Sequence, residues 1–400
     1  MPRESGHSHN PVSEGNPFRK RGIDPDTGEP VIPKKPGEFV GEYLGPDAAK
    51  AVDELVGSDK AGSGSKVEKD LEDLLTPEEQ EATRQTEERE IVDLLPNLAE
   101  QYKAQVEILQ NRGYLITLEG GKEGIVDIKG TEHALPTLQE VAERLVDRSK
   151  ETKGALTTKL EQGFTKLVIV PFGMALKKHI ELHGQTILDH DTKGTLKGAN
   201  GDTLDDLSTT QPIWTWDELT KDRGADVEGT MVYNSKVFDK DKHGGVTKAE
   251  LLKDPKEAFQ ILLLQEDLNI PRAGQGKTKE GRMQLEAGKS PKAYLETFTE
   301  AAKDRGNPYH LEAGLTPEDV LTLATTHLDE TNQVIDDYLA KDPSNNPITS
   351  ASYLTGAYLP TSDDLLPYFR YRRDDRQAGL GGYRPDNVGG SVGMRSAVRV

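Results

Sequence analysis

The C-terminal segment 366–400 is the feature that most constrains how this chain can fold. It contains four aromatic residues, seven Arg, no Lys and six Gly, and it ends in the strand-like run 392–400. A second strand-like stretch, 353–359, precedes it, so strands are expected to hold the aromatic-rich segment at both ends. Tyr and Arg provide large contacts and fork-shaped hydrogen bonding at a modest entropic cost. The pattern therefore predicts an anchored recognition surface.

Composition divides the chain into three parts. Residues 1–70 are rich in Pro, Gly, Ser, Lys and Glu, and we expect them to be disordered. Residues 71–164 are expected to form a helical and small α+β region. Residues 165–400 combine short strands, two or three helices and long loops, which predicts one irregular α+β domain. The fold class expected for the chain is therefore α+β.

Capping and periodicity signals predict the individual elements. Helices are expected from Thr76, over 98–112, after Pro136, over 174–183 with Gly184 as the stop, and from Thr316 to about Leu339. Strands are expected over 114–118, 125–128, 166–170, 232–233 and 261–264.

Charge and the lack of Cys narrow the range of functions. The net charge of −19 argues against broad affinity for nucleic acid, whereas the local excess of Arg in 366–400 suits anionic ligands. Without Cys, disulfides, thiolate zinc sites and cysteine catalysis are excluded. No apolar run is long enough to span a bilayer, and no signal peptide is seen at the N-terminus. We therefore expect a cytoplasmic protein with no membrane partner.

The segment 239–250 is the best candidate metal site. It places Asp239, Asp241 and Glu250 at positions one, three and twelve of a loop with Gly244 at position six, as a calcium-binding loop requires. His243 at position five departs from that pattern, and 230–237 is a poor entering helix. The alternative is a turn followed by a helix capped near Thr247. Calcium is thus possible, and no cofactor is required.

Two further patterns resemble a metal site and a phosphate-binding loop. His179 and His183 lie one helical turn apart, with His190 nearby, so a zinc site is geometrically possible, although an exposed basic helix explains them more simply. The run 274–278 is similar to a phosphate-binding loop, but Pro271 stands where that motif needs Gly, which favours a surface turn. Neither pattern supports catalysis, and we expect the protein not to be an enzyme.

The end of the chain resembles a known family, the variable proteins diversified by retroelements. In those proteins the C-terminal domain is C-type-lectin-like, of the sulfatase-modifying-factor kind, and its last strand carries a Gly-aromatic-Arg signature followed by alternating Val and Arg. Here the run Gly393-Met394-Arg395 is similar, with Met394 in place of the aromatic residue, and Val398-Arg399-Val400 follows. Segments around 356–360, Pro367 and 376–378 look like the scaffold between the varied positions.

The resemblance implies a C-type-lectin-like domain over 165–400 and a variable ligand-binding segment over 366–391. In this reading a rigid scaffold tolerates replacement of exposed side chains, and function is binding without turnover. The partner is expected to be a protein or a glycan. The implied binding residues are Tyr368, Phe369, Arg370, Tyr371, Arg372, Asp374, Asp375, Tyr383, Arg384, Asp386 and Asn387.

Two alternatives stay open at this point. One is a calcium-binding structural or regulatory protein that uses Asp239, Asp241 and Glu250. The other is contact with nucleic acid through the Arg-rich C-terminus, which the overall charge disfavours.

Overall fold

The computed structural model describes residues 95, 97–204, 211–338, 351–361, 364–373 and 375–400. All of them belong to one compact unit, Arg84–Val400. This part of the chain contains helices and several small sheets, which confirms the predicted α+β class. The segment 1–70 and the helix predicted from Thr76 lie outside the described residues.

Three helices begin at a Thr that forms a capping box. Thr137, Thr247 and Thr316 each accept a backbone N–H from the third helical residue, whose acidic side chain accepts the N–H of the Thr in return. The α-helices are α5 (Leu98–Asn111), α6 (Leu138–Glu151), α7 (Ala155–Glu161), α8 (Leu176–Thr192), α9 (Asp217–Thr220), α10 (Lys248–Leu251), α11 (Pro291–Ala301) and α12 (Pro317–Thr331), with a 3-10 helix, η1 (Pro255–Ala258).

A four-stranded antiparallel sheet lies at the centre of the unit. Its order is β11-β17-β8-β4, made of β11 (Glu312–Gly314), β17 (Ser396–Arg399), β8 (Gln260–Gln265) and β4 (Phe164–Val170). Alternate residues enter two different hydrophobic cores: Leu167 and Ile169 join residues of α5, α6 and α7, whereas Val168 and Val170 join residues of α8 and α12. The predicted closing strand is confirmed, because β17 pairs on both sides.

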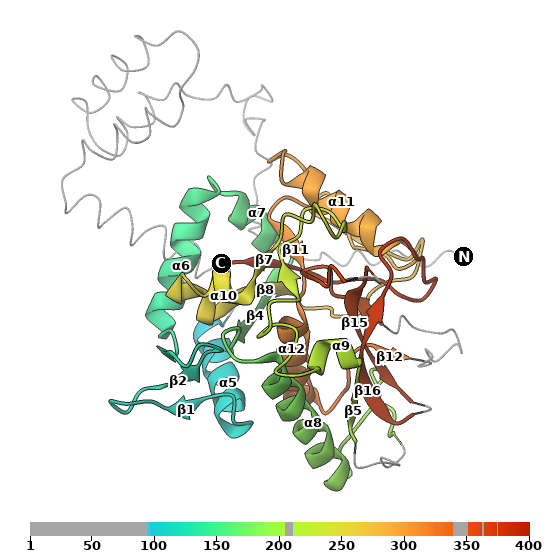
Figure 1. The fold of residues 1–400 in the computed structure, drawn as a ribbon. Coiled ribbons are helices and arrows are strands. Elements are labelled where there is room, and N and C mark those ends of the chain that lie inside the picture. Colours follow the sequence, from blue (N-terminus) through green and yellow to red (C-terminus); the bar gives the residue numbers. More distant parts are fainter. Residues whose placement is uncertain (1–94, 96, 205–210, 339–350, 362–363, 374) are drawn as a thin grey trace, which may run out of the picture. The chain divides into compact units, whose positions relative to one another are not determined.

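A second sheet carries the C-terminal segment (Figure 1). β15 (Leu366–Arg372) and β16 (Gln377–Tyr383) form an antiparallel hairpin, and β5 (Ile213–Thr215) pairs in parallel with β16. β12 (Asp337–Tyr338) and β13 (Ser352–Tyr353) pair with β15. The smaller sheets contain β1 (Ile116–Thr117), β2 (Glu123–Val126) and β3 (Glu132–Ala134); β14 (Ala357–Tyr358), β6 (Val232–Tyr233) and β7 (Val246–Thr247); and β9 (Thr278–Lys279) with β10 (Arg282–Met283).

Three predicted boundaries are wrong. Gly184 does not end α8, which continues to Thr192; a Cβ at Gly184 would lie 3.1 Å from Pro212 and 3.2 Å from Ile213, so this glycine admits β5 to the helix surface. α12 ends at Thr331 rather than near Leu339, because Asn332 adopts a left-handed conformation with φ 61°. The stretch 353–359 forms parts of two short strands, β13 and β14, that belong to different sheets.

In the described ranges, no helix combines the length and the apolar character that a bilayer crossing requires.

Candidate functional site

The two faces of the β15–β16 hairpin differ in chemistry. Phe369 and Tyr371 point inward and are 1% and 2% exposed, and Ala378 and Leu380 join them in the core around α8 and α12. The alternate residues Tyr368, Arg370 and Arg372 are half-buried and lie on the opposite face. The expectation that all the aromatic residues of this segment are exposed is therefore wrong for Phe369 and Tyr371, because seven-residue strands bury every second side chain.

Trp214 on β5 extends this opposite face. It pairs with Gly379 of β16, which in turn pairs with Arg370 of β15, so the three residues form one row across three strands. Trp214 is 47% exposed, whereas its neighbour Ile213 lies in the core. We call the surface made by Trp214, Tyr368, Arg370, Arg372 and Gly379 the outer face.

Glycines make the outer face flat. A Cβ added at Gly381 would lie 2.5 Å from the Tyr368 ring, so the absence of a side chain lets that ring lie across β16. Gly379 is buried, and a Cβ there would lie 3.9 Å from Cγ of Arg370, so the stem of Arg370 lies over this glycine. Gly382 serves the other face, where a Cβ would lie 2.8 Å from Trp216.

Tyrosine contacts hold the outer face rigidly to the core. The ring centroids of Tyr368 and Tyr383 are 5.7 Å apart, and those of Tyr383 and Tyr353 are 4.9 Å apart. Tyr353 is fully buried and contacts Tyr294 of α11 at 6.3 Å. The guanidinium of Arg370 lies 5.4 Å from the Tyr368 ring, which is a cation–π contact. Side chains of the outer face are thus partly ordered before any ligand arrives.

Two arginine forks fix the edges of this sheet. Arg373 donates to both oxygens of Asp337 and to both oxygens of Asp202, at 2.6 to 2.7 Å, which raises the pKa of its guanidinium. Arg395 donates to both oxygens of Asp336 at 2.8 Å, and Ser352 donates to the same carboxylate. Both forks join segments that are distant in the sequence, and both are largely buried.

Histidines lie beneath the inner face of the sheet. The His183 ring of α8 packs edge-on against Phe369, with centroids 5.8 Å apart, and its Nδ1 is 3.1 Å from the Thr325 hydroxyl of α12. Burial lowers the pKa of His183 to about 4, and burial also lowers that of His179 to about 4. Both rings are therefore neutral at pH 7; His183 belongs to the packing between α8, α12 and β15, whereas His179 contacts the Pro171 carbonyl and the Tyr114 ring.

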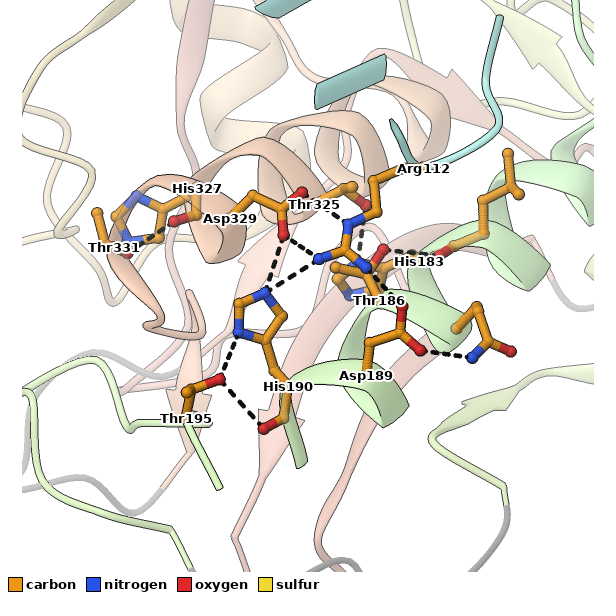
Figure 2. Close-up of polar contacts among 12 residues, drawn as sticks. Arg112, His183, Thr186, Asp189, His190, Thr195, Thr325, His327, Asp329 and Thr331 are labelled. Atoms are coloured by element: carbon orange, nitrogen blue, oxygen red, sulfur yellow. Dashed lines mark hydrogen bonds and ion pairs between the residues drawn. The ribbon is translucent and has the colours of Figure 1, made fainter. Parts of the chain in front are cut away.

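The end of α8 is held by a polar cluster (Figure 2). His190 Nε2 lies 2.8 Å from Asp329 of α12, and its Nδ1 lies 3.0 Å from Thr195. Arg112, which follows α5, donates to Asp329 and to Asp189. A hydroxyl, an imidazole and a carboxylate in sequence are also the parts of a nucleophilic triad, but His190 is only 6% exposed and the cluster joins three elements. We assign it to structure.

The predicted zinc pattern does not bring its histidines together. His179 Nε2 contacts the carbonyl of Pro171, His183 contacts Thr325, and His190 contacts Asp329. Among the described residues, no group of three or more His, Asp or Glu is arranged to hold a metal ion. The basic-helix explanation is wrong as well for His179, which is fully buried.

In the predicted calcium loop, the carboxylates serve local structure. Asp239 accepts backbone N–H groups of Asp241 and Lys242 at 2.9 and 3.0 Å, and Glu250 closes the capping box of α10 with Thr247. The residues before the loop form β6 rather than a helix. The calcium hypothesis stays a prediction, and the geometry matches the alternative of a turn followed by a capped helix.

The phosphate-loop-like run 274–278 contains backbone donors that already have an anionic partner. The N–H groups of Gly274 and Gly276 donate to the carboxylate of Glu286 at 3.0 and 2.7 Å, which lowers the pKa of Glu286. This arrangement agrees with the surface turn that the sequence favoured.

Of the remaining predicted binding residues, those that the structure describes lie beyond the ends of β15 and β16. Asp375 pairs with Arg372 at 2.6 Å, and Asp374 lies outside the described residues. Beyond β16, Arg384, Asp386 and Asn387 are exposed, and Asp386 pairs with Lys292 of α11 at 3.3 Å. Trp214 was missed by sequence reasoning, since its exposure follows from its register with Gly379, which only the tertiary structure reveals.

Comparison with known proteins gave no match. No family model, no curated protein and no solved structure is similar to the chain. The function is therefore argued from the geometry of the outer face.

Proposed function

We propose that this chain is a non-enzymatic ligand-binding protein that presents the outer face to a protein or glycan partner. One observation carries the proposal: Trp214 of β5 and Tyr368 and Arg370 of β15 lie on the same face of the sheet, on either side of β16, with Trp214 exposed and the other two partly exposed. Trp, Tyr and Arg are the residue types that contribute most to binding energy at interfaces.

The rigidity of the surface supports the same proposal. The contacts of Tyr368 with Tyr383 and of Tyr383 with Tyr353, together with the two arginine forks, order the hairpin. A preorganised surface loses less conformational entropy when a ligand binds than a flexible segment does. Replacement of Trp214 or Arg370 leaves the core around α8 and α12 intact, because that core is built from the alternate residues Phe369, Tyr371 and Leu380.

We further propose that the domain is C-type-lectin-like and belongs with the retroelement-diversified variable proteins. The run Gly393-Met394-Arg395 has a scaffold role here: Met394 is buried, Arg395 forms the fork with Asp336, and β17 follows directly. The varied positions would be the outer-face residues and the exposed turns. A near-repeat of the coding DNA that differs only opposite adenines tests this part, and its absence from the neighbouring genome contradicts it.

Selection of a ligand from displayed-protein and glycan libraries, followed by variant analysis, tests the binding role. We expect Trp214→Ala and Arg370→Ala each to weaken the selected ligand at least tenfold, about 1.4 kcal/mol or more, because both side chains lie on the outer face. Ile116→Ala is the matched control, since Ile116 is also 47% exposed but lies on β1 in a different sheet. A ligand that binds both variants as well as the native protein would contradict the proposal.

A further inference from the structure

A buried ammonium lies between two buried carboxylates inside the fold. Nζ of Lys248, the first residue of α10, is 2.8 Å from Asp226 Oδ2 and 2.7 Å from Glu318 Oε1. All three side chains are 0% exposed. The ammonium also donates to the carbonyl oxygen of Met174 at 2.8 Å. The amine is therefore held in one position, in contact with both acids.

An ion pair at this place is costly for folding. Two carboxylates against one ammonium leave an excess negative charge out of water. Asp226 Oδ1 and Glu318 Oε2 are buried and have no hydrogen-bond partner among the described residues, although buried polar atoms are normally paired. The ring centroids of Phe172 and Tyr233 lie 5.0 and 5.9 Å from Lys248 Nζ, so aromatic carbon surrounds the cluster. A reaction that removes charge from the cluster relieves this cost.

The amine can reach the carboxyl carbon of Asp226. A carbonyl carbon lies about 1.2 Å from its oxygen, so Lys248 Nζ is at most about 4 Å from Asp226 Cγ. Reacting atoms about 3 to 3.5 Å apart are in a near-attack position, which a small side-chain rotation provides. Asp226 Oδ2 accepts the N–H of Leu176, the first residue of α8, at 2.8 Å, so negative charge that develops on this oxygen is stabilised. Oδ1 faces Gly224, where a Cβ would lie 2.9 Å away.

Glu318 is placed to move the protons. Burial lowers the pKa of Lys248, but the carboxylates of Glu318 and Asp226 raise it by more, so the pKa is raised overall. The ammonium must therefore pass its proton to a carboxylate inside the cluster before the amine can act as a nucleophile. Glu318 Oε1 accepts this proton at 2.7 Å, and the Tyr233 hydroxyl donates to the same oxygen at 2.7 Å. Tyr233 is a positioning residue for Glu318.

We propose that Lys248 and Asp226 condense to an intramolecular amide bond, with Glu318 as the catalytic acid and base. Lys248 Nζ gives a proton to Glu318 and attacks Asp226 Cγ; the Nζ–Cγ bond forms and the Cγ–Oδ1 bond breaks. Two protons leave Nζ in all, and both depart with Oδ1 as one water molecule, so Glu318 returns to its starting state. One positive and one negative charge disappear, and neither an oxidant nor a reductant is needed. The remaining amide N–H can still donate to the carbonyl of Met174.

The bond closes a covalent ring through the segment 226–248, which includes β6 and β7. Such a ring restricts the unfolded chain as a disulfide does, in a chain that contains no Cys. It fixes α10 to the loop that precedes β6.

Intact mass spectrometry of the full-length native protein tests the bond directly. We expect a mass about 18 Da below that of the sequence, because one water is lost. After digestion with trypsin, the peptides that contain Asp226 and Lys248 should be recovered as one branched species, with the chain uncut after Lys248. A native mass equal to that of the sequence, with the two peptides separate, overturns the proposal.

Two adjacent acids of α12 provide matched variants. Glu318→Gln keeps the volume and hydrogen bonding of the side chain but cannot relay a proton, so we expect the full sequence mass. Asp319→Asn is the control, because Asp319 is equally buried but pairs with Arg399, and its loss of about 18 Da should persist. Lys248→Met removes the nucleophile and should also have the full mass. A branched peptide that still forms in Glu318→Gln overturns the catalytic role of Glu318.

A second buried pair is an internal control in the same digest. Lys159 lies 2.7 Å from Glu312, and both side chains are buried, but Arg282 donates to both oxygens of Glu312 and fixes it as an ion-pair partner. The peptides that contain Lys159 and Glu312 should therefore be recovered unlinked. Loss of water at this pair and none at Lys248 overturns the proposal, since burial of a Lys beside an acid would then be sufficient.

Discussion

Three glycines on β16 serve three different purposes, and each follows from what surrounds it. Gly379 lies beneath the stem of Arg370, Gly381 makes room for the Tyr368 ring, and Gly382 makes room for Trp216 on the inner side. In the sequence they appear only as a Gly-rich run, which composition assigns to a flexible segment as readily as to a strand. Their separate roles depend on which side of the sheet each residue faces, and alternation along β16 decides that.

The two outer glycines are therefore expected to respond differently to substitution. Gly381→Ala forces the Tyr368 ring to move, since the new Cβ would lie 2.5 Å from it, and we expect a loss of about 1 to 3 kcal/mol in unfolding free energy. Gly379→Ala meets no such contact and should change stability by less than about 0.5 kcal/mol. Denaturant unfolding of both variants checks this, and equal losses at the two positions would show that the outer face is arranged differently.

At the scale of elements, the sequence predicted those helices and strands whose signals are local. Capping residues predicted the start of α12, and hydrophobic runs predicted β4 and β8. The predicted end of α8 at Gly184 was wrong, because a glycine that ends a helix and one that lets a strand approach a helix look the same in sequence. The β15–β16 hairpin was expected as an anchored segment but not as two regular strands, since its glycines and arginines are poor strand signals.

Burial of two histidines of α8 is expected to make the free energy of unfolding depend on pH. His183 and His179 have pKa values lowered to about 4 by burial, whereas an unfolded His titrates near 6.5. Between these values the unfolded chain binds more protons, so stability is full above about pH 6.5 and falls as the pH decreases toward 4. Each pKa unit of difference corresponds to about 1.4 kcal/mol per histidine.

His183→Asn provides the check, since Asn offers an amide near the position of Nδ1 but does not titrate. The slope of unfolding free energy against pH between 6.5 and 4 should become shallower by the contribution of one proton. A slope identical to that of the native protein would mean that His183 is not buried in its neutral form.

At the scale of the molecule, one sheet separates two cores, and a second sheet carries the candidate site. In the central sheet, of order β11-β17-β8-β4, the C-terminal strand β17 lies between β8 and β11. The sheet that contains β15 and β16 is held by α8 below and by the forks of Arg373 and Arg395 at its edges. The residues of the candidate site on β15 could be predicted, because the residue types of the C-terminal segment are distinctive. Trp214 could not, because it lies on β5, far from that segment in the sequence.

Amide hydrogen exchange of the native protein tests the central claim, that a rigid paired hairpin presents the outer face, most directly. The amides of β15 and β16 pair with each other along seven registered positions, so we expect the paired amides to exchange orders of magnitude more slowly than an unstructured chain. Complete exchange across 366–383 within seconds would contradict the account, since a flexible segment would not hold the outer face in place.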